Sequence, residues 1–382
     1  MTARPEPLQV VLPVPEAPPL LAGIPAVVRA ARALCEDDGL AVFLRSPARD
    51  PIAPWRPLLS GLPVRELGSG RGALSPREGL APLAPVLVLS PQGVPEPAAL
   101  SRFAREARAA RRPSAWLWHG APVAVFHPQA IRWLEDAARV GGPELLACPA
   151  APADWHSLTD AAGVSRAEER LYRSLRSESD GYLARLDRRL SIAISRRLVE
   201  TPVTPNQLTA CGLALGLLGA SWLASPGYGA SVAGALLLCF CCVLDGCDGE
   251  VARLKLLSSP FGARFDVAAD SVVHLAVFAA IPLHLSRLHP GLDFRAPGLL
   301  LASGVLLSMF WVWRLILSRP QAERPGASRT FERLASRDFL YLVAALAAAR
   351  KLDWFLWSAA VGAHLFWISL VALSPSRRPL AR

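Results

Sequence analysis

Four aspartates beside apolar, membrane-length stretches are the feature that most constrains how this chain can fold. Asp245, Asp248, Asp266 and Asp270 all lie within the segment DGCDGEVARLKLLSSPFGARFDVAAD. An ionisable side chain at membrane depth is costly, so it marks a functional site by default. Carboxylates gathered in one place also repel one another unless a cation lies between them. A pair of divalent metal ions is the simplest explanation for this arrangement.

The spacing of the aspartates assigns them to two helix faces. Asp245 and Asp248 are three residues apart, and Asp266 and Asp270 are four apart, so each pair projects from one side of a helix. Between the pairs lie small residues and an arginine, namely Gly249, Ala252, Arg253 and Gly262. Small residues let a bulky group approach the backbone, and arginine offers paired donors to phosphate oxygens. The segment therefore predicts a pocket for a metal-bound diphosphate.

The same eight residues resemble the signature of the CDP-alcohol phosphotransferases, also called CDP-alcohol phosphatidyltransferases. Every position of the pattern is filled, as Asp245-x2-Asp248-Gly249-x2-Ala252-Arg253-x8-Gly262-x3-Asp266-x3-Asp270. The resemblance covers roughly residues 165–375 and includes Thr204-Pro205-Asn206 and Thr209 at the first membrane helix. It implies a membrane enzyme that transfers a phospho-alcohol group, phosphatidyl or inositol phosphate, from a CDP-alcohol to an acceptor hydroxyl. CMP would be released, in phospholipid or inositol-phosphate biosynthesis.

The resemblance also assigns roles to individual residues. Two divalent ions, Mg²⁺ or Mn²⁺, are expected on Asp245, Asp248, Asp266 and Asp270. Asp270 is in addition the expected general base, which takes the proton from the acceptor hydroxyl. The residues expected to hold the CDP-alcohol are Asn206, Gly249, Ala252, Arg253 and Gly262.

The apolar half of the chain, residues 201–376, predicts a transmembrane bundle of six helices. They are expected at about 207–224, 230–252, 263–287, 296–318, 337–350 and 353–374. The alternative is five spans, because Arg350-Lys351 divides what otherwise reads as one long segment. Arginines precede the first helix and follow the fourth, the sides that the positive-inside rule assigns to the cytoplasm. We therefore expect an inner-membrane protein whose aspartate site faces the cytoplasm.

Residues 165–200 predict an amphipathic helix, with leucines at steps of three and four and arginines between them. Such a helix suits the membrane interface, and a surface helix packed on a soluble domain is the alternative. Residues 151–164 are rich in alanine and proline and read as a linker.

Residues 1–150 predict an α/β domain with a mainly parallel, Rossmann-type sheet. The expected strands are 9–12, 40–44, 86–89 and 123–126, and the expected helices are 25–35, 98–110 and 128–140. Residues 21–34 and 123–137 resemble parts of a sugar-phosphate nucleotidyltransferase domain.

This domain lacks the features that an active nucleotidyltransferase needs. The first strand leads into Pro13-Val14-Pro15-Glu16-Ala17-Pro18-Pro19 instead of a glycine-rich loop. Because proline has no backbone N–H to offer to a triphosphate, we expect a degenerate domain without catalytic activity. A binding or regulatory role and a purely structural one both remain open.

The order of these parts is similar to that of bifunctional inositol-phosphate cytidylyltransferase and di-myo-inositol phosphate phosphate synthases. The donor is accordingly CDP-inositol or CDP-diacylglycerol, and the sequence does not decide between them. The other expected partners are an alcohol or phospho-alcohol acceptor, membrane lipids and a second copy of the chain. A nucleotide-binding pseudoenzyme and an ion or proton transporter are the competing classes of function.

The net charge of +10 is better explained by anionic lipid headgroups than by nucleic acid, since the arginines flank the apolar segments. The proline-rich first residues lack the pattern of a signal peptide, so the N-terminal domain is expected in the cytoplasm. Arg314, Arg319 and Arg337-Asp338 either meet a phosphorylated acceptor or anchor the bundle. His274 either assists proton transfer or packs in the core.

Overall fold

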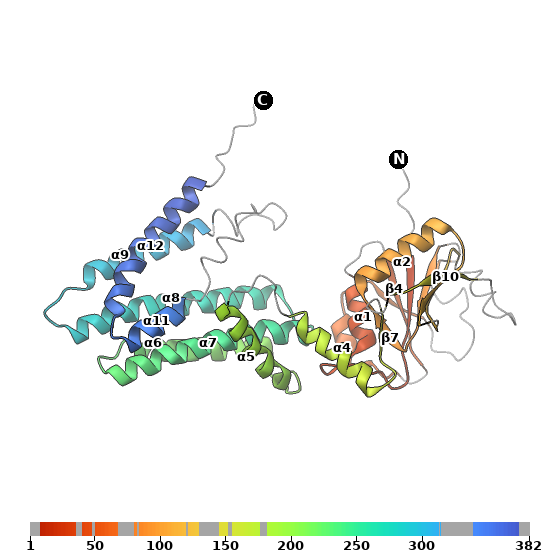
Figure 1. Cartoon of the computed structure of the whole chain (residues 1–382), viewed down its shortest axis with the longest axis horizontal. Helices are drawn as coiled ribbons and strands as arrows, with labels where there is room; N and C mark the ends of the chain where they lie inside the picture. Colours follow the sequence, from red (N-terminus) through yellow and green to blue (C-terminus); the bar gives the residue numbers. More distant parts are fainter. Residues whose placement is uncertain are drawn as a thin grey trace, which may run out of the picture. The chain divides into compact units, whose positions relative to one another are not determined.

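The computed structural model describes residues 8–35, 40–47, 50–67, 80–81, 84–119, 121–129, 145–151, 155–175, 182–312, 314 and 339–373. They form two compact units that divide between Leu175 and Arg176. The first unit is an α/β domain, and the second is built from helices (Figure 1).

A seven-stranded sheet forms the centre of the first unit. Its spatial order is β10 (Leu146–Pro149), β8 (Ser114–Trp118), β9 (Ala121–His127), β6 (Val86–Leu89), β1 (Leu8–Pro13), β4 (Leu40–Arg45) and β5 (Val64–Leu67). Only β9 among these described strands is antiparallel to its neighbours. The central strand β1 is almost wholly buried, as expected for a parallel strand covered on both faces.

Shorter elements surround this sheet. They are β2 (Leu20–Leu21), β3 (Ile24–Pro25), α1 (Ala26–Leu34), the 3₁₀ helix η1 (Ala53–Leu59), β7 (Gly93–Pro95) and α2 (Pro97–Ala110). Phe103 of α2 stacks on Trp116 of β8 with ring centroids 5.3 Å apart, which fixes this helix against the sheet.

The expected α/β class of the N-terminal half is confirmed. The four expected strands correspond to β1, β4, β6 and β9, and the helices expected at 25–35 and 98–110 correspond to α1 and α2. The helix expected at 128–140 lies almost entirely outside the described residues.

The region between the sheet and the membrane helices contains a strand and two helices. β11 (Trp155–Ser157) pairs with β7, and α4 (Ala161–Arg173) begins where Asp160 accepts a hydrogen bond from the Gly163 amide at 2.9 Å. α4 belongs to the first unit, because Glu168 accepts a hydrogen bond from the Ala22 amide at 2.9 Å. α5 (Tyr182–Leu198) belongs to the second unit. Where the sequence suggested one helix over 165–200, the structure has two.

The second unit contains six further described helices. They are α6 (Pro205–Leu223), α7 (Tyr228–Leu254), α8 (Pro260–Leu288), α9 (Arg295–Val312), α11 (Phe339–Ala348) and α12 (Leu352–Leu373). Among the described helices, four are long and apolar enough to cross a membrane: α7, α8, α9 and α12. α6 starts with a polar turn, and α11 has only 10 residues. The second unit is therefore a helical domain with the composition of an integral membrane protein.

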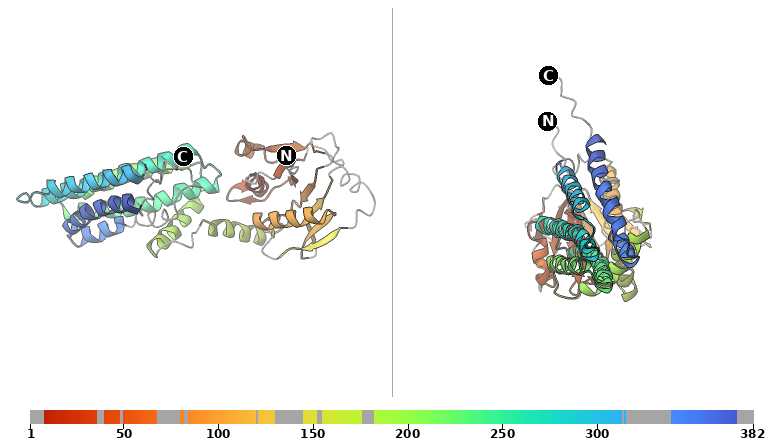
Figure 2. Two further views of the ribbon diagram at one scale, coloured as in Figure 1. Left: turned by 90° about the horizontal axis from the view of Figure 1, so that it is seen from above. Right: turned by 90° about the vertical axis from the view of Figure 1, so that its left-hand side faces the viewer.

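Glycines allow α6 and α7 to pack closely. α6 runs side by side with both α7 and α8 (Figures 1 and 2). A Cβ atom placed on Gly234 of α7 would lie 2.5 Å from both the Gly219 carbonyl oxygen and the Leu223 nitrogen of α6. Small residues at such crossings let helix backbones approach each other in membranes. This crossing fixes the register in which Thr209 of α6 lies opposite Asp248 of α7.

Gly234→Ala is expected to destabilise the helical unit by about 1–3 kcal/mol, because the added methyl group overpacks a backbone contact. Thermal unfolding of the detergent-solubilised protein measures this as a lower Tm. Gly229→Ala is the matched control in the same helix, because a Cβ at Gly229 meets nothing within 4 Å. Equal Tm values for the two variants would contradict the proposed role of the crossing.

Candidate functional site

A tight connection between α7 and α8 brings the aspartates together. α7 ends with Leu256 in the left-handed region at φ 57°, and the Leu257 amide donates back to the Ala252 carbonyl at 2.8 Å. This is the hydrogen bond of a Schellman-type helix end. α8 then begins after Ser259, whose hydroxyl accepts a hydrogen bond from the Gly262 amide at 3.0 Å. The last turns of α7 therefore face the first turns of α8.

Three of the four predicted aspartates converge at this connection. One carboxylate oxygen from each of Asp245, Asp248 and Asp266 lies within 4.8 Å of the other two. Asp248 is only 5% exposed. One oxygen of Asp266, Oδ1, is buried and has no hydrogen-bond partner among the described residues. Converging carboxylate oxygens with unused acceptor capacity fit a hard divalent cation.

Asp270 lies one turn further into α8, on the same helix face as Asp266. It is half-buried and is close enough to Asp266 and Asp248 for their charges to repel. It is not one of the three residues whose oxygens converge. Its roles as a metal ligand and as a base therefore stay predictions.

Thr209 of α6 orients one of the clustered carboxylates. Its buried hydroxyl donates a hydrogen bond to Asp248 Oδ2 and lies 3.2 Å from the Pro205 carbonyl oxygen. The start of α6 is fixed by a capping box, in which the side chains of Thr204 and Gln207 bond each other's backbone amides. The sequence pattern included Thr209 but gave no hint of this contact, which requires two helices to meet.

A groove of about 200 Å³ opens beside the aspartates. All five residues predicted to hold the CDP-alcohol line it, together with Asp248 and Asp266; they are Asn206, Gly249, Ala252, Arg253 and Gly262. A Cβ at Gly249 would meet nothing within 4 Å, so this glycine leaves open space. A Cβ at Gly262 would lie 3.1 Å from Asn206 Oδ1, so that glycine brings α8 close to α6.

Arg253 provides the positive charge of the groove. It is exposed, and among the described residues it forms no ion pair. Lys255, just beyond the end of α7, is committed elsewhere: its Nζ donates to the carbonyls of Thr201 and Val203, the latter at 2.7 Å. Burial lowers the pKa of Lys255 from its ordinary value. Arg253 is thus the cation positioned to meet an anion in the groove.

Another acidic residue near the site, Glu250, has a structural role that sequence reasoning missed. Glu250 is fully buried and lies on the other side of α7 from Asp248, as expected for residues two apart in a helix. Its Oε1 accepts from Arg188 Nη1 at 3.2 Å and from Ser191 Oγ at 2.6 Å. These contacts bind α5 to α7. The position of a charged residue inside an apolar helix could have indicated from the sequence that Glu250 has a buried partner.

Of the remaining candidates, only His274 and Arg314 are among the described residues, and neither lines the groove. The His274 ring lies edge-on to Phe339 with centroids 5.1 Å apart, as in core packing. Arg314 is exposed. Arg319 and the Arg337-Asp338 pair lie outside the described residues.

Comparisons with known proteins agree with this geometry. Residues 202–373 match the family model described as CDP-alcohol phosphatidyltransferase. The chain is 33% identical over 207 residues to a "Bifunctional IPC transferase and DIPP synthase" of Rubrobacter xylanophilus, covering 53% of this chain and 46% of that protein. It is 32% identical over 111 residues to a CDP-diacylglycerol–serine O-phosphatidyltransferase of Helicobacter pylori, covering 29% and 43% of the two chains. The chain thus spans less than half the length of these relatives.

Among solved structures, the chain is similar to Mycobacterium tuberculosis phosphatidylinositol phosphate synthase with CDP-DAG bound. The identity is 22%, the TM-score is 0.36, and the match covers 49% of this chain and 96% of the other.

The second unit combines four helices of membrane-spanning length and composition with an acidic site where α7 ends and α8 begins. Residues 202–373 are a domain of the CDP-alcohol phosphatidyltransferase family. The resemblance inferred from the eight-residue pattern is confirmed.

Asp245→Asn is expected to weaken divalent metal binding strongly without unfolding the protein, because it removes a charged ligand and keeps the side-chain shape. Titration with Mn²⁺ followed by electron paramagnetic resonance measures the affinity, and circular dichroism checks the fold. Unchanged Mn²⁺ affinity in this variant would contradict the metal assignment.

Thr209→Val is expected to weaken Mn²⁺ binding about 10- to 100-fold, because loss of an outer hydrogen bond frees the ligating carboxylate. Thr209→Ser keeps the hydroxyl and is the matched control. The same Mn²⁺ titration measures the affinity of both variants. Equal affinities would show that the hydrogen bond to Asp248 does not contribute to metal binding.

Proposed function

We propose that this chain is an integral membrane CDP-alcohol phosphotransferase. It transfers a phosphatidyl or inositol-phosphate group from a CDP-alcohol to an acceptor hydroxyl and releases CMP. The observation that carries this proposal is the convergence of Asp245, Asp248 and Asp266 beside the groove. The membership of residues 202–373 in the family supports it.

Two divalent ions, Mg²⁺ or Mn²⁺, are proposed at the aspartates. Asp245, Asp248 and Asp266 would hold them, and Asp270 would complete the ligand set. When bound, such ions neutralise a diphosphate and polarise the phosphorus that is attacked. The buried Asp266 oxygen without a partner supports this occupancy.

The groove residues have separate proposed roles in holding the donor. Gly249 and Ala252 leave room for the cytidine, since a Cβ at Gly249 meets open space. Arg253 contacts the diphosphate with its fork of donors. Asn206 and Gly262 form the facing wall, where α6 and α8 approach each other.

The proposed reaction is an in-line displacement at phosphorus. The acceptor oxygen forms a bond to the phosphorus of the donor alcohol phosphate, and the bond from that phosphorus to the CMP oxygen breaks. Asp270 takes the proton of the acceptor hydroxyl, and CMP leaves with the bonding electron pair. A fixed carboxylate near the hydroxyl contributes through position as well as basicity.

Two classes of donor are compatible with this site. CDP-inositol is favoured by the similarity to a bifunctional IPC transferase and DIPP synthase. With this donor, the chain would have an activity like that of the di-myo-inositol phosphate phosphate synthases. CDP-diacylglycerol is favoured by the similarity to a CDP-diacylglycerol–serine O-phosphatidyltransferase. A nucleotide-binding pseudoenzyme is the remaining alternative.

The proposed arrangement in the membrane has six spans. α6 and α11 join the four helices of membrane-spanning length and composition, and the aspartate site and first unit face the cytoplasm at the inner membrane. α5, within the expected segment 165–200, is proposed at the interface, because Leu186 and Leu190 are about half exposed beside arginines. The same proposal keeps the domain limits expected from the sequence, which are 1–150, 151–164 and 201–376. It also includes a homodimer.

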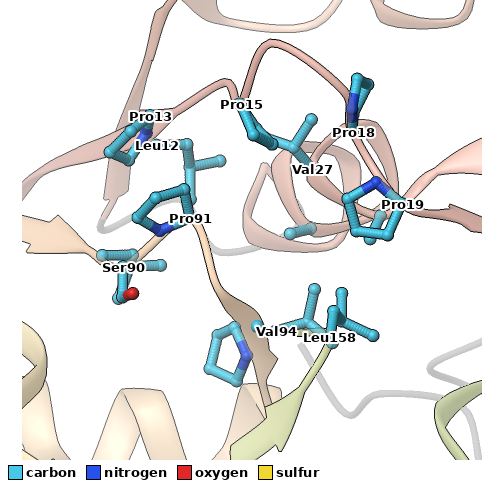
Figure 3. Close-up of a pocket in the computed structure, with 15 residues that line it drawn as sticks. Leu12, Pro13, Pro15, Pro18, Pro19, Val27, Ser90, Pro91, Val94 and Leu158 are labelled. Atoms are coloured by element: carbon cyan, nitrogen blue, oxygen red, sulfur yellow. The ribbon is translucent and has the colours of Figure 1, made fainter. Parts of the chain in front are cut away.

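The first unit is proposed to be a degenerate nucleotidyltransferase-like domain. A small cavity lies at the carboxyl ends of β1 and β6 (Figure 3), where open α/β sheets bind ligands. Prolines dominate its wall, including Pro13, Pro15, Pro18 and Pro19. No ionisable side chain is among the described residues that line it, so it offers no charge to a metal-bound triphosphate.

The proposed function predicts metal-dependent CMP release from purified protein given CDP-diacylglycerol or CDP-inositol with candidate acceptors. Asp270→Asn is expected to lower the rate by about 10²- to 10⁴-fold, the usual contribution of a general base. CMP is measured by liquid chromatography. Ion flux across vesicles without CMP release would favour a transporter, and CDP-alcohol binding without turnover would favour a pseudoenzyme.

A degenerate first unit predicts no pyrophosphate release when the full chain is incubated with CTP, an inositol phosphate and Mg²⁺. None of the described residues that line the cavity at β1 and β6 carries a charge for the triphosphate, and the aspartate site is proposed to consume CDP-alcohols and not to form them. Pyrophosphate release at any rate above the protein-free control would overturn this part of the proposal.

A further inference from the structure

A cavity of about 680 Å³ lies at the end of the helical unit opposite the aspartates. Its walls come from the start of α7, the end of α8, the segment before α9 and the connection between α11 and α12. The α6–α7 and α8–α9 connections lie at the same end of the bundle in Figure 1. This end takes no part in the proposed reaction.

The cavity is separated from the aspartate site by the thickness of a membrane. Ser231 lines the cavity and Asp248 lines the groove, and both lie on α7. At the rise of an α-helix they are about 25 Å apart along the axis. A bilayer has a hydrocarbon core about 30 Å thick. The cavity therefore opens at the opposite membrane boundary.

Basic residues gather at this end although the positive-inside rule disfavours them there. Some have structural partners. Arg287 donates to the Ala224 carbonyl at 3.0 Å, and His284 Nδ1 lies 2.6 Å from the Ser225 carbonyl oxygen. Both therefore cap the end of α6, and their presence is explained by packing.

Arg350 and Lys351 have no such explanation. Both line the cavity and are exposed. Within the part of the chain that the structure describes, neither has a carboxylate partner within ion-pair distance. The Arg350 guanidinium lies 4.4 Å from the centroid of the Tyr228 ring, and Lys351 Nζ lies 5.5 Å from that of Trp354.

The backbone holds Arg350 in a conformation that usually selects glycine. Its φ is 57°, and the Lys351 amide donates to the Leu346 carbonyl at 2.8 Å in a Schellman end of α11. Glycine is strongly preferred at this position because it has no Cβ. Tyr228 braces the same end, since its hydroxyl donates to the Ala348 carbonyl at 2.9 Å. The turn at Arg350 is thus rigid, and its backbone conformation gives no reason for a cationic side chain at this position.

Apolar side chains line the cavity together with these cations. Leu288, Leu292 and Trp357 line it and are 43%, 61% and 55% exposed. Leu285 and Phe294 line its buried side. Asp353 is the one carboxylate among the described residues that line the cavity, so Arg350 and Lys351 leave it with a net positive charge. A net positive charge beside apolar side chains matches an amphiphile with an anionic head and hydrocarbon chains.

We propose that this cavity binds the phosphate of an anionic phospholipid from the leaflet opposite the aspartate site. Arg350 and Lys351 bind the phosphate oxygens, and Leu288 and Trp357 contact the acyl chains. The shared chemistry is a phosphate ester anion, for which a soluble phosphate ester is the other source. The inference rests on the membrane embedding of the second unit and is independent of the proposed reaction.

The test compares lipid binding to the unmodified chain and to three variants that each remove one positive charge. Arg350→Gly suits the backbone at its position, so the turn is kept. Lys351→Gln removes the second cation. Arg295→Gln is the matched control, because Arg295 lies at the same end of the bundle but does not line the cavity. Phosphatidylglycerol, phosphatidylcholine and glycerol phosphate are titrated separately, with native mass spectrometry as the readout.

Phosphatidylglycerol is expected to bind more tightly than phosphatidylcholine, and Arg350→Gly and Lys351→Gln are each expected to weaken it about fivefold. Arg295→Gln is expected to leave it unchanged. Equal weakening in all three variants, or none in any, would overturn the site. Binding of glycerol phosphate as tight as that of the lipid would overturn the lipid source. Lipid binding that persists without CMP release would refute the proposed function alone.

Discussion

Repulsion among three carboxylates is the constraint on which the helical unit depends. Two unit charges at the separation of Asp245, Asp248 and Asp266 repel by on the order of 3 kcal/mol at an intermediate effective dielectric. The surrounding structure holds them together all the same, within 4.8 Å. The close crossing at Gly219 and Gly234 fixes α6 on α7, and the tight connection after Leu254 folds α8 back. The rest of the bundle is arranged to hold this unfavourable cluster in place.

α5 also packs against α7 and helps to hold the end of α7 that carries the aspartates. Its buried face is made of small residues, Ser191 and Ser195, with Ile192. A Cβ at Gly246 of α7 would lie 3.1 Å from the Ser191 side chain, so the two helices are in close contact. Arg188 reaches the buried Glu250, and the Tyr341 hydroxyl of α11 donates to Asp187. α5 is therefore a fixed part of the helical unit, whereas Leu186 and Leu190 are exposed.

Much of the site could be predicted from the sequence because helical spacing dictates which side chains share a face. The intervals between Asp245, Asp248, Asp266 and Asp270 placed them on neighbouring helices without any knowledge of the fold. The expected helix limits were close to the observed ones, because apolar runs and prolines mark membrane helices clearly. The groove residues followed from the family pattern.

Features built from contacts between distant segments could not be predicted in this way. The pairing of Arg188 with Glu250 joins residues 62 apart in sequence, and no local pattern marks such a pair. The break between α4 and α5 was missed because both segments are amphipathic and read as one helix from the sequence. The cavity with Arg350 and Lys351 depends on several connections meeting in space. Local sequence patterns predict which side chains share a helix face and where a helix ends. Contacts between separate elements can be identified only once the fold is known.

The capped helix starts beside the groove have one further consequence. α6 and α8 both begin with proline, which offers no N–H, and a side-chain oxygen occupies the amide of Gln207 in one helix and of Gly262 in the other. These helix ends therefore give an arriving nucleotide little of the attraction that bare amides provide. With the carboxylates of Asp248 and Asp266 and only one arginine among the described residues that line it, an ion-free groove would repel a diphosphate. Under the proposed function, we therefore expect cation loading to precede nucleotide capture.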